Sequence, residues 1–205
     1  AQQASAALQE ELLFFQGMGL QDALSRFATT LSVLQSPQSV SRVASEICDD
    51  AETEGVTSLE IRFAPQLHKG ASMETIVDAA LEGINQRAGL ILCGLYGEPP
   101  ERIENLVTIG ANRPGVVGID LAGGPAPSHS HHLCDYASAF TKAKDQGLGR
   151  TVHAGEGRAP QEIKDSIIHL HAQAQGCGIA IFKSLVHILF YQVYDGGHLP
   201  SLSFL

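Results

Sequence analysis

The residues best suited to chemistry are a histidine and a glutamate separated by two small residues, in the segment His153-Ala-Gly-Glu156. An imidazole nitrogen can bind a metal ion, and a carboxyl group whose pKa is raised by burial can shuttle a proton. Ala154 and Gly155 leave room for a ligand to approach the backbone closely. The pattern is weak by itself, because a histidine bonded to backbone at a strand end and a glutamate capping a helix would look the same.

A second set of candidate residues begins at Asp120 and continues to Gly123 and Gly124. An aspartate at a strand end can orient a ligand or a metal-bound histidine, and the glycines expose backbone N–H groups to a flat ligand. The same residues also suit an ordinary strand–helix turn in which Asp120 caps the helix. Both interpretations stay open on the sequence alone.

Glu60 and Arg62 form a third polar group, since they alternate with Leu59, Ile61 and Phe63. Alternation places both charged side chains on one face of a strand. We expect them to form an ion-paired support network rather than to act directly in catalysis.

Three histidines, His129, His131 and His132, are close in sequence but have no regular spacing. We expect a solvated Ser/Pro-rich loop there rather than a metal site.

The chain has no GxSxG, GxxxxGK[ST] or GxGxxG motif, and no HxE followed by PCxxC. Serine hydrolases, P-loop proteins, dinucleotide-binding proteins and small zinc deaminases therefore lack their signatures here.

The elements that must position these residues are short apolar segments alternating with helical ones. Strand character is found at 59–63, 89–97, 116–124 and 150–157, and helical character at 39–50, from 72 onward, and at 99–111, 133–144 and 160–171. Strict alternation implies parallel strands with right-handed crossovers, as in a (β/α)8 barrel or a doubly wound sheet. In both folds chemistry occurs at the C-terminal ends of the strands, where Arg62, Asp120, His153 and Glu156 gather. An enzyme site is therefore favoured over a plain scaffold.

Composition supports a globular chain with a small-molecule or protein partner. The chain has 205 residues, of which 44% are hydrophobic, and its 13 basic and 22 acidic residues give a net charge of −9. Such a charge disfavours nucleic acid and anionic membranes as partners. The four cysteines are scattered without a CxxC motif, which indicates a reducing compartment, and we expect the cytoplasm. The apolar run 179–194 is too short for a membrane span and is interrupted by Lys183 and His187.

Three segments together resemble a known family. LEIRFAPQLH (59–68), PGVVGIDLAGG (114–124) and RTVHAGE (150–156) are similar, in order and spacing, to the adenosine deaminase family of metal-dependent amidohydrolases. The stretch 30–56 fits the helical segment before the first motif, and the resemblance covers roughly residues 10–173. It implies an α/β fold of the (β/α)8 TIM-barrel type with one Zn²⁺ ion at the C-terminal mouth.

The resemblance also implies a role for three residues. His153 would bind zinc, Glu156 would protonate the purine ring nitrogen N1, and the backbone N–H of Gly123 would contact purine N3. Zinc would lower the pKa of a bound water toward about 7, and the resulting hydroxide would convert adenosine to inosine and ammonia.

The sequence departs from the family pattern at the other zinc ligands. The family has an HxH pair on its first strand, whereas residues 1–58 contain no histidine. Cys177 stands between two glycines where the family has a histidine, and Asp195 stands alone where the family has an Asp-Asp pair. Only His153 is identifiable as a ligand. We therefore expect a fragment with about half of the barrel, four parallel βα units, and with impaired or no activity alone.

The chain is predicted to divide after residue 173. Residues 1–173 would form the partial barrel, and residues 174–205 a divergent tail that holds one of the 22 acids but five of the 12 aromatic residues. The tail is either a core helix over 179–194 or sequence foreign to the family. Two other functions stay open: deamination of adenine or another aminopurine nucleoside, and a non-catalytic binding or regulatory half-barrel. A purine nucleoside is the expected partner, with self-association through exposed sheet edges.

Overall fold

The computed structural model describes residues 13, 15, 17–18, 20–124, 126, 128–155, 159–176 and 190–193. Its centre is a six-stranded sheet with the strand order β5-β4-β3-β2-β1-β6. Strands β1 to β5 are parallel, and β6 is antiparallel to β1. The strands are β1 (Leu59–Phe63), β2 (Gly89–Leu95), β3 (Val116–Ala122), β4 (Gly149–His153), β5 (Ala174–Gly176) and β6 (Phe190–Val193).

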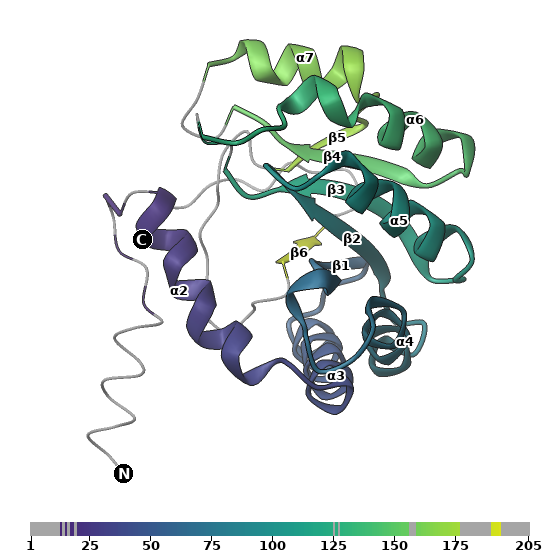
Figure 1. Cartoon of the computed structure of the whole chain (residues 1–205). Helices are drawn as coiled ribbons and strands as arrows, with labels where there is room; N and C mark the ends of the chain where they lie inside the picture. The colour runs from purple at the N-terminus through teal and green to yellow at the C-terminus, as the bar shows by residue number, and fades with distance from the viewer. Residues whose placement is uncertain are drawn as a thin grey trace.

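The helices follow one another around one side of this sheet, from α3 through α4, α5 and α6 to α7 (Figure 1). Their bounds are α2 (Leu20–Val33), α3 (Pro37–Thr53), α4 (Met73–Ile84), α5 (Pro100–Ala111), α6 (Ala137–Asp145) and α7 (Gln161–His169), with short 3-10 turns η1 (Pro65–Leu67) and η2 (Leu133–Tyr136). The predicted alternation of four parallel strands with helices is confirmed. The order of the strands follows the chain from β1 to β5, as in part of a (β/α)8 barrel.

Local capping signals set the starts of α3 and α4. Ser72 caps α4 as predicted, since its side chain accepts the Thr75 N–H. Helix α3 begins at Pro37, two residues before the predicted start, because Ser36 and Ser39 form a capping box.

Several predicted elements are shorter or divided in the structure, among them β2, β3 and α7. The helix expected over 133–144 begins as the 3-10 turn η2 and becomes α-helical only at Ala137. The strand expected over 150–157 ends at His153, because Gly155 turns the chain with a φ of +74°.

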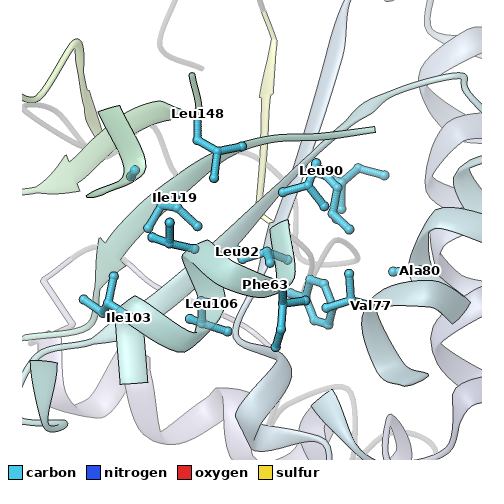
Figure 2. Packing of buried hydrophobic residues seen from close by; sticks show 14 of the residues in the cluster. Phe63, Val77, Ala80, Leu90, Leu92, Ile103, Leu106, Ile119 and Leu148 are labelled. Atoms are coloured by element: carbon cyan, nitrogen blue, oxygen red, sulfur yellow. The ribbon is translucent and has the colours of Figure 1, made fainter. Parts of the chain in front are cut away.

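The core lies between the sheet and the helices. Alternate strand residues point toward α4, α5 and α6, and Figure 2 shows Phe63, Leu90, Leu92 and Ile119 packed with helix residues such as Leu106. The opposite face of β2 is also buried, since Ile91 is 5% and Cys93 is 2% exposed. A strand buried on both faces has the continuous apolar sequence that identified β2.

The tail contributes two strands to the described structure. Strand β5 pairs with β4, and β6 pairs with β1 in a register that sets Ile61 opposite Tyr191. A core helix over the whole of 179–194 is therefore wrong at 190–193, which are strand. The β1 edge, expected to be exposed, is covered by β6. Residues 177–189 and 194–205 lie outside the described residues, and Cys177 is among them.

None of the helices described is both long and apolar enough to cross a membrane.

Candidate active site

Four polar side chains form a row across the sheet, one from each of the strands β1 to β4. Arg62 on β1, Cys93 on β2, Asp120 on β3 and His153 on β4 are all at most 7% exposed. Their immediate neighbours along each strand, such as Ile61, face the helices and belong to the core. Because strand side chains alternate, the row lies on the face away from the helices, which is the inner face of a barrel.

Asp120 is the centre of the row. Its carboxylate oxygens lie 3.2 Å and 3.1 Å from His153 Nδ1, and Oδ2 lies 3.4 Å from Arg62 Nη1. The Cys93 thiol donates to the same oxygen over 3.7 Å. Burial alone would raise the pKa of Asp120, but His153, Arg62 and Cys93 together hold that pKa below its usual value. Asp120 is therefore a buried carboxylate rather than a neutral acid.

The Asp120 contact determines the tautomer of His153. A carboxylate can only accept, so in the neutral imidazole the proton stays on Nδ1 and the lone pair on Nε2. A carboxylate behind the ring also makes the other nitrogen a stronger ligand. In the neutral ring this contact therefore places the proton on Nδ1 and the lone pair on Nε2.

Cys93 belongs to this network, although the sequence did not single it out. Burial, and then the Asp120 charge, raise the pKa of the Cys93 thiol well above its ordinary value, so it remains a hydrogen-bond donor. Cys93 and Asp120 are opposite one another in the β2–β3 register. No local sequence signal marks this pairing, because the register is set by the packing of the two strands.

Two of the sequence alternatives can be decided. Asp120 lies inside β3, two residues before its end, so the hypothesis of an N-cap aspartate is wrong. Arg62 does form an ion pair, as expected, but with Asp120. Glu60 is only half-buried; burial raises its pKa, and the Arg62 charge opposes that rise.

Gly123 lies just past the end of β3 with a φ of +77°. A Cβ atom built there would meet only Leu95 Cδ2, at 3.9 Å, among the described atoms. A ligand can therefore approach this backbone, and the positive φ explains why the position is a glycine.

The turn after β4 is anchored by α7. The Gly155 N–H donates to Glu162 Oε2 over 3.1 Å, and a Cβ atom at Gly155 would lie 2.8 Å from the Ile163 side chain. The next residue, Glu156, lies outside the described residues. Its predicted role is therefore not addressed by the geometry.

The three histidines His129, His131 and His132 differ in how far the structure buries them. His129 is half-buried, its Nδ1 accepts the Ala126 N–H over 3.1 Å, and its ring packs against Gly97 after β2. His131 is half-buried and His132 exposed. The prediction of a solvated loop is therefore wrong for His129.

The described residues do not form a complete zinc site. Within the described ranges no three His, Cys, Asp or Glu side chains are close enough to hold a metal ion together. Zinc sites in proteins use at least three protein ligands, so a complete site would need residues beyond the described ones.

Solved structures define the class of fold. Residues of this chain superpose on an adenine deaminase from Arthrobacter aurescens with a TM-score of 0.70 and 24% identity, covering 82% of this chain and 53% of that one. An amidohydrolase from Burkholderia ambifaria with bound zinc gives 0.67 and 21%, covering 80% and 46%. The N6-methyl-AMP deaminase of Arabidopsis thaliana gives 0.66 and 24%, covering 80% and 52%. The fold therefore matches about half of each of these structures.

Sequence comparison identifies the family within that class. The adenosine deaminase family model matches residues 2–190, and the chain belongs to this family of hydrolases. An adenosine deaminase of Clostridium perfringens is 34% identical over 175 residues, covering 80% of this chain and 52% of the relative. One from Vibrio vulnificus is 34% identical over 188 residues, covering 86% and 55%. The chain thus spans about half the length of these curated relatives.

Proposed function

We propose that this chain contributes part of the active site of an adenosine deaminase, the enzyme that converts adenosine and water to inosine and ammonia. In this proposal His153 binds zinc through Nε2, the Gly123 N–H contacts purine N3, and Glu156 donates a proton to purine N1. The observation that supports it best is the Asp120–His153 contact, because metal-binding histidines in proteins usually have a carboxylate or carbonyl behind the ring.

The neighbours of His153 fit this role. Arg62 and Cys93 both stabilise the ionised form of Asp120, and the ionised form is the one that accepts the His153 Nδ1 proton. Arg62 thereby acts on the ring through Asp120 and not by contact with a substrate. Gly123 offers a backbone without a side chain at the end of the adjacent strand.

Among the described residues, His153 is the one ligand that we propose, so these residues form only part of a metal site. When zinc is bound in such a site, it supplies a water ionised near neutral pH. We propose that the remaining ligands come from another polypeptide. The chain alone then has impaired or no deaminase activity.

Adenosine is the preferred candidate substrate because the relatives with about 34% identity are named adenosine deaminases. Adenine or another aminopurine nucleoside is the second candidate, since the superposed structures include an adenine deaminase and an N6-methyl-AMP deaminase. A non-catalytic half-barrel is the alternative of a different class.

Titration of the ¹⁵N-labelled chain with inosine and with adenine tests the purine assignment. We expect the Gly123 amide signal to shift on addition of inosine, because its N–H would donate to the purine ring. Gly147 is the matched control: it also has a positive φ, +75°, but no atoms within 4 Å of its Cβ position. Equal shifts at both glycines, or none at Gly123, would contradict a purine site. A larger response to adenine than to inosine would favour the second substrate.

Zinc content and deamination of the purified full chain test the catalytic part. We expect less than one tightly bound zinc per chain and little or no inosine formation. One tight zinc per chain together with rapid turnover would disprove the incomplete site. Where any deamination is measured, Glu156→Gln should abolish it, and an unaffected rate would remove Glu156 from its proposed role.

A further inference from the structure

Two buried tyrosines adjoin the row of polar side chains without belonging to it. Tyr96 follows β2 and Tyr136 ends η2, and their rings meet edge to face with centroids 6.3 Å apart and planes at 86°. Tyr96 is 6% exposed and Tyr136 is fully buried. A phenol hydroxyl buried this deeply requires a hydrogen-bond partner.

The Tyr96 hydroxyl has its partner on the backbone of His153. It donates to the His153 carbonyl oxygen over 2.9 Å, across 57 residues of sequence. Asp120 holds the ring of the same histidine at Nδ1. His153 is therefore held at two points, its backbone by a residue from the end of β2 and its ring by a residue from β3.

The turn that carries Tyr96 is held by hydrogen bonds to Tyr136 and to Ala122. The Tyr136 hydroxyl accepts the Gly97 N–H and donates to the Glu98 carbonyl, each over 2.9 Å. The Tyr96 N–H donates to the Ala122 carbonyl over 3.0 Å. The turn after β2 is thus bonded to η2 and to the end of β3. A movement of this turn would break these three hydrogen bonds.

We propose that Tyr96 is a positioning residue for His153. With the carbonyl held by Tyr96 and Nδ1 held by Asp120, the backbone and the imidazole of His153 have one favoured arrangement, and Nε2 keeps one direction. A ligand held in this way loses less conformational freedom when it binds a cation. The proposal rests on the proposed function of His153, but the arrangement of the ring can be measured without a metal.

The test compares Tyr96→Phe with the unchanged full chain, both labelled with ¹³C and ¹⁵N. The variant keeps the ring and removes only the hydroxyl. We expect the His153 carbonyl ¹³C signal to move upfield, because the carbonyl loses a donor. We also expect the His153 ring signals to broaden or double, because the ring gains arrangements. Zinc affinity should fall by about tenfold, the lower end of the effect of losing support around a ligand.

Tyr136→Phe is the matched control, since it loses two partly buried hydrogen bonds but none to His153. It should lower the melting temperature while leaving the His153 carbonyl signal in place. Ring signals of His153 that are the same in Tyr96→Phe and in the unchanged chain would overturn the proposal and make Tyr96 a purely structural residue.

A second measurement covers the case in which Tyr96→Phe does not fold. Incorporation of 3-fluorotyrosine makes the phenol a stronger donor, so the His153 carbonyl signal should move downfield. An unchanged carbonyl signal would overturn the proposal. Failure of the proposed function gives a different result: zinc would leave the His153 ring nitrogens of the unchanged chain unaffected, while Tyr96→Phe would still alter the ring signals.

Discussion

At the scale of single residues, the charged side chains of Asp120 and Arg62 are buried on the face of the sheet that faces away from the helices. Asp120 has no exposed surface, and Arg62 and His153 beside it are at most 7% exposed. Buried ions of this kind are costly unless each has partners, and here one carboxylate has three. Asp120 is therefore the residue on which the arrangement of the candidate site depends most.

Asp120→Asn should destabilise the chain strongly. Removing one member of a buried ion pair costs about 3–5 kcal/mol, because the remaining charge loses its compensation. Urea unfolding measures the change, with Asp145→Asn on the exposed end of α6 as the control expected within about 0.5 kcal/mol of the unchanged chain. Since the pKa of Asp120 is lowered on folding, its contribution is present above about pH 3.9 and is lost as the pH falls below that value. A small and pH-independent difference would argue against the ion pair.

His68 is a second buried titratable residue with a measurable consequence. Its Nδ1 donates to the Leu34 carbonyl, and its ring meets Phe63 edge to face with centroids 5.3 Å apart. Burial lowers the pKa of His68, and the bond to Leu34 opposes this shift only in part. The folded chain therefore holds His68 neutral at a pH where the unfolded chain already binds a proton.

The melting temperature should consequently fall as the pH is lowered from about 6.5 toward the folded pKa of His68. His68→Asn keeps an N–H donor near Leu34 but does not titrate, so its melting temperature should depend less on pH in this range. His132→Asn, at an exposed position, should behave like the unchanged chain. Parallel pH profiles for the unchanged chain and His68→Asn would disprove the assignment.

At the scale of elements, helices α3 and α4 pack closely against each other at Gly83. A Cβ atom at Gly83 of α4 would lie 2.1 Å from the Ser41 carbonyl oxygen and 3.0 Å from Ala44 Cβ of α3. Glycine is ordinarily a poor helix residue, but here the absence of a side chain allows the two helices to pack. The sequence showed a helix here but not the contact that requires this glycine.

Gly83→Ala should therefore destabilise the chain, although alanine favours helix. Overpacking of this kind costs about 1–3 kcal/mol, because the obstacle is backbone and cannot move aside. Gly110→Ala in α5 is the matched control, since its Cβ would meet only side-chain atoms, the nearest being Val116 Cγ1 at 2.9 Å. Thermal unfolding of both variants measures the difference, and equal stabilities would contradict the argument.

At the scale of the whole molecule, the described sheet is open and not closed. Its parallel part ends at β5, and β6 covers the β1 edge. Helix α7 lies at the β4–β5 end of the sheet (Figure 1). Its residues Ile167 and Ile168 are each 52% exposed. Exposed apolar side chains beside a sheet edge favour association. The division of the chain after residue 173 remains a prediction.

Self-association is therefore expected at the β5 side of the sheet. Sedimentation velocity of the full chain should show species larger than a monomer that increase with concentration. Replacing both Ile167 and Ile168 with lysine should reduce them, because charge at an edge opposes association. Val33→Lys is the control, since Val33 is 71% exposed but lies on α2. A stable monomer at all concentrations would rule out self-association.

The sequence by itself determined the alternation of strands and helices and the family to which the chain belongs. Those signals are local: apolar runs, capping serines such as Ser72, and motifs whose residues are adjacent, such as the segment from His153. These signals can be recognised in the sequence without knowledge of the tertiary structure, because each depends on residues only a few positions apart.

Only the tertiary structure decided which side chains meet. Asp120 contacts Arg62 from 58 residues away and His153 from 33 residues away, and Tyr96 reaches the His153 carbonyl across 57 residues. Cys93 and Tyr96 belong to an apolar strand segment that, read alone, looks like ordinary core. The physical reason is that contacts between strands depend on their register, which is set by packing of the whole sheet and has no local sequence signal.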